Sequence, residues 1–375
     1  MSTCLKTIFI IGMFSLIITI GCSQTSQPTT NPEPVKPSAA LSYDFINRDA
    51  TSQAEIEEVI GSVVAGYLIV NDEYPRSLLV NYLYKDKCFY FPLITSSHPV
   101  IFKDLQNNPK VCFAVDKYTQ LHWWSANIFG KAQIIKETAL VSKWLNEYEN
   151  VLGKDGFNYP AQKDLPNTVM VKITPETISG RKMTDPQNPN FAPRLPWITL
   201  SHGKADTDVA AKLLPVEISD STLPKEISLN GVDSKVAESI LKGVGACRLN
   251  LLDTEYPYSI PMSVMSYNNG KVLLHSNKKG HKMDCLRTNT KVSVDYQWFW
   301  NNSNWIGMYL EGHINIIEKP EDIAQVLGMG ETGIPMAERM AQRMAVLEFV
   351  PEKIVARQIE IPLKWYSRMP GTKTR

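Results

Sequence analysis

The sequence has few of the residues from which common catalytic and metal centres are built. Its 375 residues include 6 histidines and 6 cysteines, and they contain no Cys-x-x-Cys pair. No P-loop, GxGxxG fingerprint or Ser/His/Asp arrangement is evident. The formal net charge of +1 does not indicate nucleic-acid binding. Four cysteines beyond residue 22 lie in apolar surroundings and are predicted to be buried free thiols: Cys88, Cys112, Cys247 and Cys285.

The apolar stretch near the start of the sequence is shorter than a typical transmembrane helix. The apolar stretch 7–20 is too short for one and is typical of a secretory signal. The residues up to Cys22 resemble a bacterial lipobox, although an uncleaved anchor or an ordinary signal peptide is the alternative. We therefore predict a lipoprotein signal peptide over 1–22 with Cys22 lipidated, a flexible Pro/Thr/Ser-rich tether over 23–42, and a location in the bacterial cell envelope as a lipid-anchored membrane protein.

The remaining chain repeats itself. The tripeptide Glu73–Pro75 recurs 182 residues later as Glu255–Pro257, and Gly130 recurs after the same interval as Gly312. Further anchors follow in the same order, which indicates tandem duplication of one domain. We predict a first repeat over 43–182, a proline-rich connector over 183–230 and a second repeat over 231–375.

Each repeat contains many short apolar strands and few helices. Typical of the strands are "GYLIVND", "KCFYFPL" and "KVLLHS", whereas "ETALVSKWLNEYENVL" has the period of a helix. This pattern predicts a mainly β protein with peripheral helices, a β-barrel or α+β fold. The acidic residues at the repeated turns are interpreted as turn formers: Asp72, Glu73, Asp253 and Glu255.

One segment of the second repeat suits a phosphate group. A strand ends at His275-Ser276, a loop containing Gly280 follows, and His281-Lys282 begins a helix. A helix N-terminus offers unpaired backbone N–H groups and a positive dipole end, and glycine permits close approach of the backbone. A solvated basic loop is the alternative. The first repeat has "SSHPVIFKD" at this place, which predicts that only the second repeat retains a site.

The second repeat resembles the pyridoxamine 5′-phosphate oxidase-like, FMN-binding split barrels, especially the branch that includes the nitroimidazole-resistance proteins. That branch shows a His-Ser-x-x-x-Gly-basic-Lys run, which this chain matches from His275 to Lys282. The first repeat is similar more loosely. The resemblance implies FMN as cofactor and two tandem split barrels that form an intramolecular pseudo-dimer.

The resemblance also implies the residues of the site. His275, Ser276, His281 and Lys282 would hold the FMN phosphate, although the family usually has arginine where His281 stands. Two further groups of residues are implied. Arg248 and Asn250 on an early strand would border the flavin, and tryptophans would line the facing wall, with Trp305 as the chosen candidate among Trp123, Trp124, Trp300 and Trp305.

The leading functional hypothesis is an envelope-anchored flavoprotein that performs reductase or oxidase chemistry on a small molecule. The flavin would carry the redox chemistry, which agrees with the lack of a catalytic constellation. A lipoprotein that binds or senses flavin, haem or another ligand without turnover is the second hypothesis. A structural envelope module is the third.

Overall fold

The computed structural model describes residues 44–48, 51–118, 122–154, 158–184, 226–228, 230, 232–299 and 304–360. The predicted signal peptide with Cys22, the tether and most of the connector lie outside these residues. Within the described ranges, no helix is both long enough and apolar enough to span a membrane.

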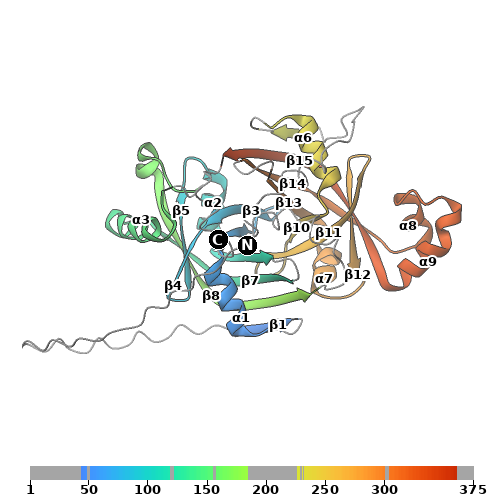
Figure 1. Ribbon diagram of the computed structural model, residues 1–375, viewed down its shortest axis with the longest axis horizontal. Helices are drawn as coiled ribbons and strands as arrows, with labels where there is room; N and C mark the ends of the chain where they lie inside the picture. Colours follow the sequence, from blue (N-terminus) through green and yellow to red (C-terminus); the bar gives the residue numbers. More distant parts are fainter. Residues whose placement is uncertain are drawn as a thin grey trace, which may run out of the picture. The chain divides into compact units, whose positions relative to one another are not determined.

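The first repeat is built mainly from strands, as its alternating and apolar segments predicted (Figure 1). Its strands are β1 (Asp44–Arg48), β2 (Ala65–Val70), β3 (Arg76–Asn81), β4 (Leu83–Lys85), β5 (Cys88–Ile94), β6 (Lys110–Tyr118), β7 (His122–Ile135) and β8 (Thr168–Thr184). Its helices are α1 (Gln53–Ser62), α2 (Pro99–Asn107), α3 (Thr138–Leu152) and the 3-10 helix η1 (Gln162–Asn167).

The second repeat copies this order. Its strands are β9 (Glu226–Ser228), β10 (Ala246–Leu251), β11 (Tyr258–Asn268), β12 (Lys271–Asn277), β13 (Lys291–Phe299), β14 (Asn304–Ile317) and β15 (Met344–Glu360). Its helices are α6 (Ser234–Gly243), α7 (His281–Thr288), α8 (Pro320–Val326), η3 (Glu331–Gly333) and α9 (Ile334–Arg343). Strand β9 lies within the range predicted to be connector. It pairs in parallel with β15, as β1 does with β8.

The two sheets have matching strand orders, and the second closes on itself. The first follows the order β3-β2-β6-β7-β8-β5-β4, and the second follows β12-β11-β10-β13-β14-β15, where β12 also pairs with β15. The long strand β11 corresponds to β3 and β4 together, which are separated only by Tyr82. The prediction of two tandem β-barrels with peripheral helices is therefore confirmed.

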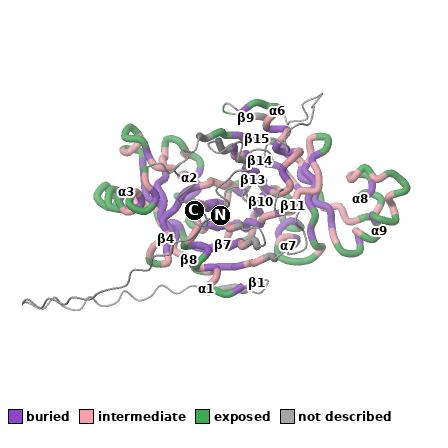
Figure 2. The backbone as a smooth tube through the Cα atoms, viewed as in Figure 1, coloured by how far each residue is buried: buried purple, intermediate pink, exposed green. Residues whose placement is uncertain are grey.

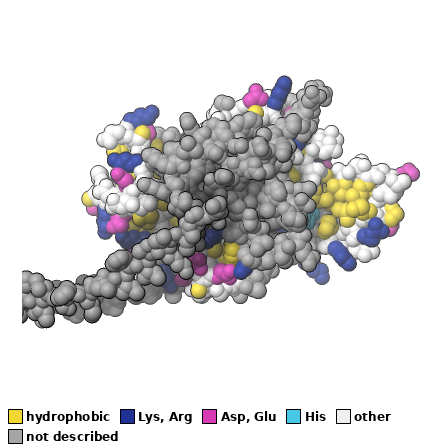
Figure 3. Space-filling view, viewed as in Figure 1, with side chains coloured by type: hydrophobic (Ala, Val, Ile, Leu, Met, Phe, Trp, Pro, Cys, Tyr) yellow, Lys and Arg dark blue, Asp and Glu magenta, His cyan; other side chains and the backbone are white. Residues whose placement is uncertain are grey.

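Apolar side chains fill each barrel, and among the described residues the strands are accordingly the most buried (Figure 2). The four cysteines that the structure describes are free and buried, as predicted. Helices α8 and α9 cover β12 and β15 through a smaller cluster that includes Leu273, Ile323 and Val346. Hydrophobic side chains are visible on the outer surface of this helical region (Figure 3), where Met336 is exposed.

The repeated glycines Gly130 and Gly312 have a structural cause. Each lies at an irregularity in the pairing of two long strands, β7 with β8 and β14 with β15. A Cβ atom would overlap the carbonyl oxygen of Thr174 at the first position and that of Val350 at the second. The duplication thus preserves a bulge that only glycine permits.

Candidate functional site

The start of α7 has the backbone that the phosphate-site hypothesis requires. Gly280 adopts φ 109° and ψ 165°, a conformation that is essentially restricted to glycine. The backbone N–H groups of Met283 and Asp284 donate to the Gly280 carbonyl oxygen at 2.8 and 3.2 Å. Among the described residues, the N–H groups of His281 and Lys282 have no hydrogen-bond acceptor. Two donors at a positive helix end therefore remain open to an anion.

Lys282 places a half-buried ammonium group at this helix start. Its ammonium group contacts the Met262 sulfur at 3.4 Å, and no carboxylate of the described chain bonds to it. Burial, followed by the positive charge of Arg181, lowers the pKa of Lys282 to about 8. Arg181 belongs to β8 of the first repeat, so basic groups from both repeats act on the same place. Such a site would be stabilised by an anion.

The end of β12 carries two other predicted phosphate ligands, Ser276, which is buried, and His275, which is exposed. The Ser276 side chain is buried, and its hydroxyl donates to the Asn277 carbonyl oxygen at 2.9 Å. The His275 ring lies at the surface, where partial desolvation and the charge of Lys282 lower its pKa. Lys282 and His275 are therefore neighbours, whereas the Ser276 hydroxyl would have to rotate to reach a ligand.

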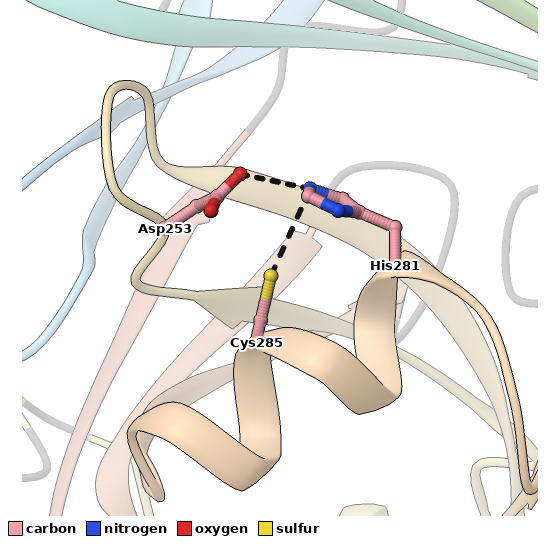
Figure 4. A group of neighbouring side chains, drawn as sticks. All are labelled: Asp253, His281 and Cys285. Atoms are coloured by element: carbon pink, nitrogen blue, oxygen red, sulfur yellow. Dashed lines mark hydrogen bonds and ion pairs between the residues drawn. The ribbon is translucent and has the colours of Figure 1, made fainter.

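His281 faces a carboxylate and a thiol, two contacts that its position in the sequence did not indicate. Its Nε2 atom lies 2.8 Å from Asp253 Oδ2 and 3.7 Å from Cys285 Sγ (Figure 4). Asp253 follows β10, and its Oδ1 accepts a hydrogen bond from the Thr254 backbone at 2.7 Å. It therefore contacts the backbone of the segment between β10 and β11 and is a partner of His281 as well. Burial, the carboxylate of Asp253 and that of Asp284 raise the pKa of Cys285 to about 12.

Arg248 is buried among groups of both repeats. It forms an ion pair with Asp116 of β6 and donates to the Ser259 hydroxyl at 2.9 Å and to the Ser125 hydroxyl at 3.4 Å. Its guanidinium carbon lies 5.2 Å from the centre of the Tyr67 ring. Protein groups thus hold this side chain, and its predicted role at the border of a flavin stays a prediction.

Asn250 continues the same buried polar layer. Its amide donates to Asp295 Oδ2 at 2.7 Å and to the Ser293 hydroxyl at 3.0 Å, and its oxygen accepts from the Ser259 hydroxyl at 2.6 Å. Ser77 of the first repeat donates to Asp295 Oδ1 at 2.6 Å. Burial raises the pKa of Asp295 to about 6 in spite of these hydrogen bonds. Asn250 therefore orients a buried carboxyl group that sequence reasoning missed.

The repeated Glu-Tyr-Pro turns form reciprocal contacts between the repeats. Lys110 bonds to Glu255 at 2.6 Å, and its counterpart Lys291 bonds to Glu73 at 2.5 Å. The two tyrosines behave alike: the Tyr74 hydroxyl donates to Glu352 at 2.6 Å, and the Tyr256 hydroxyl donates to Glu176. The recurrence of these residues was the available signal, and it reflects contacts between repeats as well as turn formation.

The corresponding helix start in the first repeat has less positive charge. His98 immediately precedes α2, and Pro99 begins the helix in place of a basic residue. Burial and the positive charge of Arg357 lower the pKa of His98. Arg357 lies in β15 of the second repeat, as Arg181 lies in β8 of the first.

Of the four tryptophans predicted as candidates for the wall facing the flavin, the structure describes only the side chain of Trp124, so the choice of Trp305 stays a prediction. Trp124 is held within the first repeat, where its indole N–H donates to Glu55 Oε1 at 3.0 Å. The side chains of Trp123, Trp300 and Trp305 lie outside what the structure describes.

Both repeats match known family models. Residues 54–182 match one model described as pyridoxamine 5′-phosphate oxidase, and residues 233–358 match a second model with the same description. No curated protein matches the chain.

Solved structures are similar to about one repeat each. An FAD-binding protein from Mesorhizobium loti is 22% identical with a TM-score of 0.32, and the match covers 36% of this chain and 96% of that one. A candidate 5-nitroimidazole antibiotic resistance protein from Bacteroides thetaiotaomicron is 20% identical with a TM-score of 0.29, covering 34% and 86%. The FAD-binding protein from Mycobacterium smegmatis is 19% identical with a TM-score of 0.28, covering 37% and 100%.

Proposed function

The chain belongs to the pyridoxamine 5′-phosphate oxidase-like family through both of its repeats, and on that premise we propose that it is a flavoprotein that binds one FMN in the second repeat. The observation that carries this proposal is the half-buried Lys282 ammonium, which has no carboxylate bonded to it among the described residues and belongs to the helix turn that has two open N–H groups. A phosphate group would accept hydrogen bonds from all three and offset the desolvation of the ammonium. The residues present therefore fit the cofactor.

The flavin, when bound, would supply redox chemistry on a small-molecule substrate. The protein's part is to bind and orient it. Lys282 and the first turn of α7 would hold the phosphate, while Arg181 would add positive charge from the first repeat. Ser276 and His275 are the further candidates at the strand end. His281 would contribute chiefly its backbone N–H, because its Nε2 atom faces Asp253.

We propose that the repeats pair as an intramolecular pseudo-dimer. The support is the reciprocity of the Lys110–Glu255 and Lys291–Glu73 contacts, since equivalent residues exchange roles across a two-fold interface. The lower positive charge at the start of α2 supports one flavin per chain. A lipid anchor on Cys22 in the bacterial envelope is part of the same proposal and is supported by the leader sequence alone.

The decisive experiment is to purify residues 23–375, denature the protein and record the visible spectrum of the released ligand. We expect FMN at about one per chain. Two per chain would refute the single-site proposal, and FAD would refute the choice of cofactor. A colourless protein that takes up no added FMN would overturn the flavoprotein proposal itself.

The Asp253–His281 contact favours a second candidate, a protein that binds flavin without turnover. The carboxylate offsets positive charge where the family usually has arginine, and weaker retention of the cofactor would suit a carrier or sensor. Anaerobic reduction by NADH and NADPH separates the two functions. An enzyme should show faster reduction of bound flavin than of the same concentration of free FMN, whereas a carrier should show no acceleration.

A further inference from the structure

Three different metal-binding side chains converge at the edge of the second barrel. One ligand atom each from Asp253, His281 and Cys285 lies within 4.8 Å of the other two. His281 and Cys285 are one helical turn apart on α7, so their side chains extend from the same face. Asp253 reaches them from the turn after β10 (Figure 4).

The geometry differs from that of a nucleophilic cysteine with its general base. In such a relay the histidine uses one ring nitrogen toward the nucleophile and the other toward the carboxylate. Here the single Nε2 atom of His281 faces both partners, at 2.8 Å from Asp253 Oδ2 and 3.7 Å from Cys285 Sγ. All three groups thus point to one place, as ligands of a shared ion do.

We propose that Asp253, His281 and Cys285 form a binding site for a divalent transition-metal ion, with Zn²⁺ as the best match. Sulfur, imidazole nitrogen and carboxylate oxygen are its preferred ligands, and four-coordinate geometry is usual. Three protein ligands leave one position for water or another external ligand. On binding, Cys285 forms a bond to the metal and releases its thiol proton to solvent, while neutral His281 donates its Nε2 lone pair.

Charge and access both suit this ion. A thiolate and a carboxylate together neutralise the two positive charges of the metal. The Cys285 side chain is buried, which protects the metal–sulfur bond from solvent. The His281 side chain is 41% exposed, and that of Asp253 is 25% exposed, so an ion can enter from the surface. The bound metal would join the turn after β10 to the first turn of α7.

Cobalt titration of the flavin-free protein tests the site directly. Co²⁺ replaces Zn²⁺ in tetrahedral sites and is coloured, and thiolate ligation adds an intense near-ultraviolet charge-transfer band. We expect both signals at one Co²⁺ per chain and their loss on addition of one Zn²⁺. Binding without the charge-transfer band, or with several weak equivalents, would mean an adventitious ion only and would overturn the proposal.

Matched variants assign the signal to these residues. Cys285→Ser and Asp253→Asn should each weaken Zn²⁺ binding by more than about 100-fold, beyond the 10–100-fold typical of a change outside the ligand set. Cys247→Ser is the control, because Cys247 is also a buried cysteine but is not among the three ligands. Equal Zn²⁺ affinity in Cys285→Ser and Cys247→Ser would refute the site. Circular dichroism establishes that each variant is folded.

The readout is the metal itself, so this proposal can fail while FMN binding stands. The reverse also holds, since the titration uses protein without flavin. Repeating it with FMN-loaded protein measures whether the two ligands, which would share the start of α7, affect each other.

Discussion

Replacing Lys282 by methionine should stabilise the flavin-free protein while weakening its binding of FMN. Methionine preserves the apolar stem against Met262 and removes the ammonium that burial disfavours. A fall of the lysine pKa from 10.5 to about 8 corresponds to about 3 kcal/mol of unfavourable free energy in the folded state. We therefore expect a gain of up to about 3 kcal/mol in the free energy of unfolding at pH 7.

The pH dependence of this gain has a definite sign. Below pH 8, Lys282 is charged in both the folded and the unfolded protein, and the cost of burying the charge is fully present. Between pH 8 and 10.5 the folded protein releases this proton first, so the wild type gains stability relative to the variant as the pH rises. The advantage of Lys282→Met should thus be largest near pH 7 and disappear near pH 10.5.

Urea unfolding measures the stability, and fluorescence titration measures the affinity for FMN. Loss of a hydrogen bond to a charged group predicts FMN binding that is about 10- to 100-fold weaker. Lys319→Met is the control, because Lys319 is exposed at the start of α8, and its stability should change by less than about 0.5 kcal/mol. A Lys282→Met protein that is less stable than the wild type at pH 7 and binds FMN equally well would overturn both the expected cost of burying the ammonium and its proposed role in FMN binding.

Two further predictions concern the backbone and the contact between repeats. Gly280→Ala should lower the free energy of unfolding by about 1–3 kcal/mol. Backbone strain is the sole cause, because no atom lies within 4 Å of the added Cβ. Gly61→Ala inside α1 should instead raise the free energy of unfolding by about 0.5–1 kcal/mol. Equal effects in urea unfolding would contradict the strain argument. Asp116→Ala should lower the free energy of unfolding by about 3–5 kcal/mol, because it removes the carboxylate that pairs with buried Arg248. Glu255→Gln removes the charge from an exposed ion pair and should lower the free energy of unfolding by less than about 1 kcal/mol. A small effect of both substitutions would contradict the larger cost expected for breaking the buried ion pair.

The barrels were predictable because their patterns are local. Alternating apolar strands and an amphipathic α3 are each visible within a few residues of sequence, whereas Gly130 and Gly312 were visible only as a recurrence and their bulge was not predicted. The start of α7 was predictable for the same reason, since Gly280 and Lys282 are close neighbours along the chain.

The partners across the repeats were not predictable. Nothing near Arg248 in the sequence indicates that it meets Asp116, which lies 132 residues away. The spacing of His281 and Cys285 was visible, but a third ligand was needed to give it meaning. Asp253 was interpreted only as a turn former, because no local pattern shows that the turn after β10 folds against α7.

The two arginines on the last strands have a consequence for how this chain can change over generations. The positive charge of Arg181 in the first repeat lowers the pKa of Lys282 in the second. The positive charge of Arg357 in the second repeat likewise lowers the pKa of His98 in the first. In a dimer of identical chains, one codon would specify both arginines. Every substitution would then change both helix starts at the same time. Here each arginine has its own codon. One repeat can therefore lose the proposed phosphate site at its helix start while its last strand still supplies an arginine to the other repeat. Single substitutions can thus make the two repeats different.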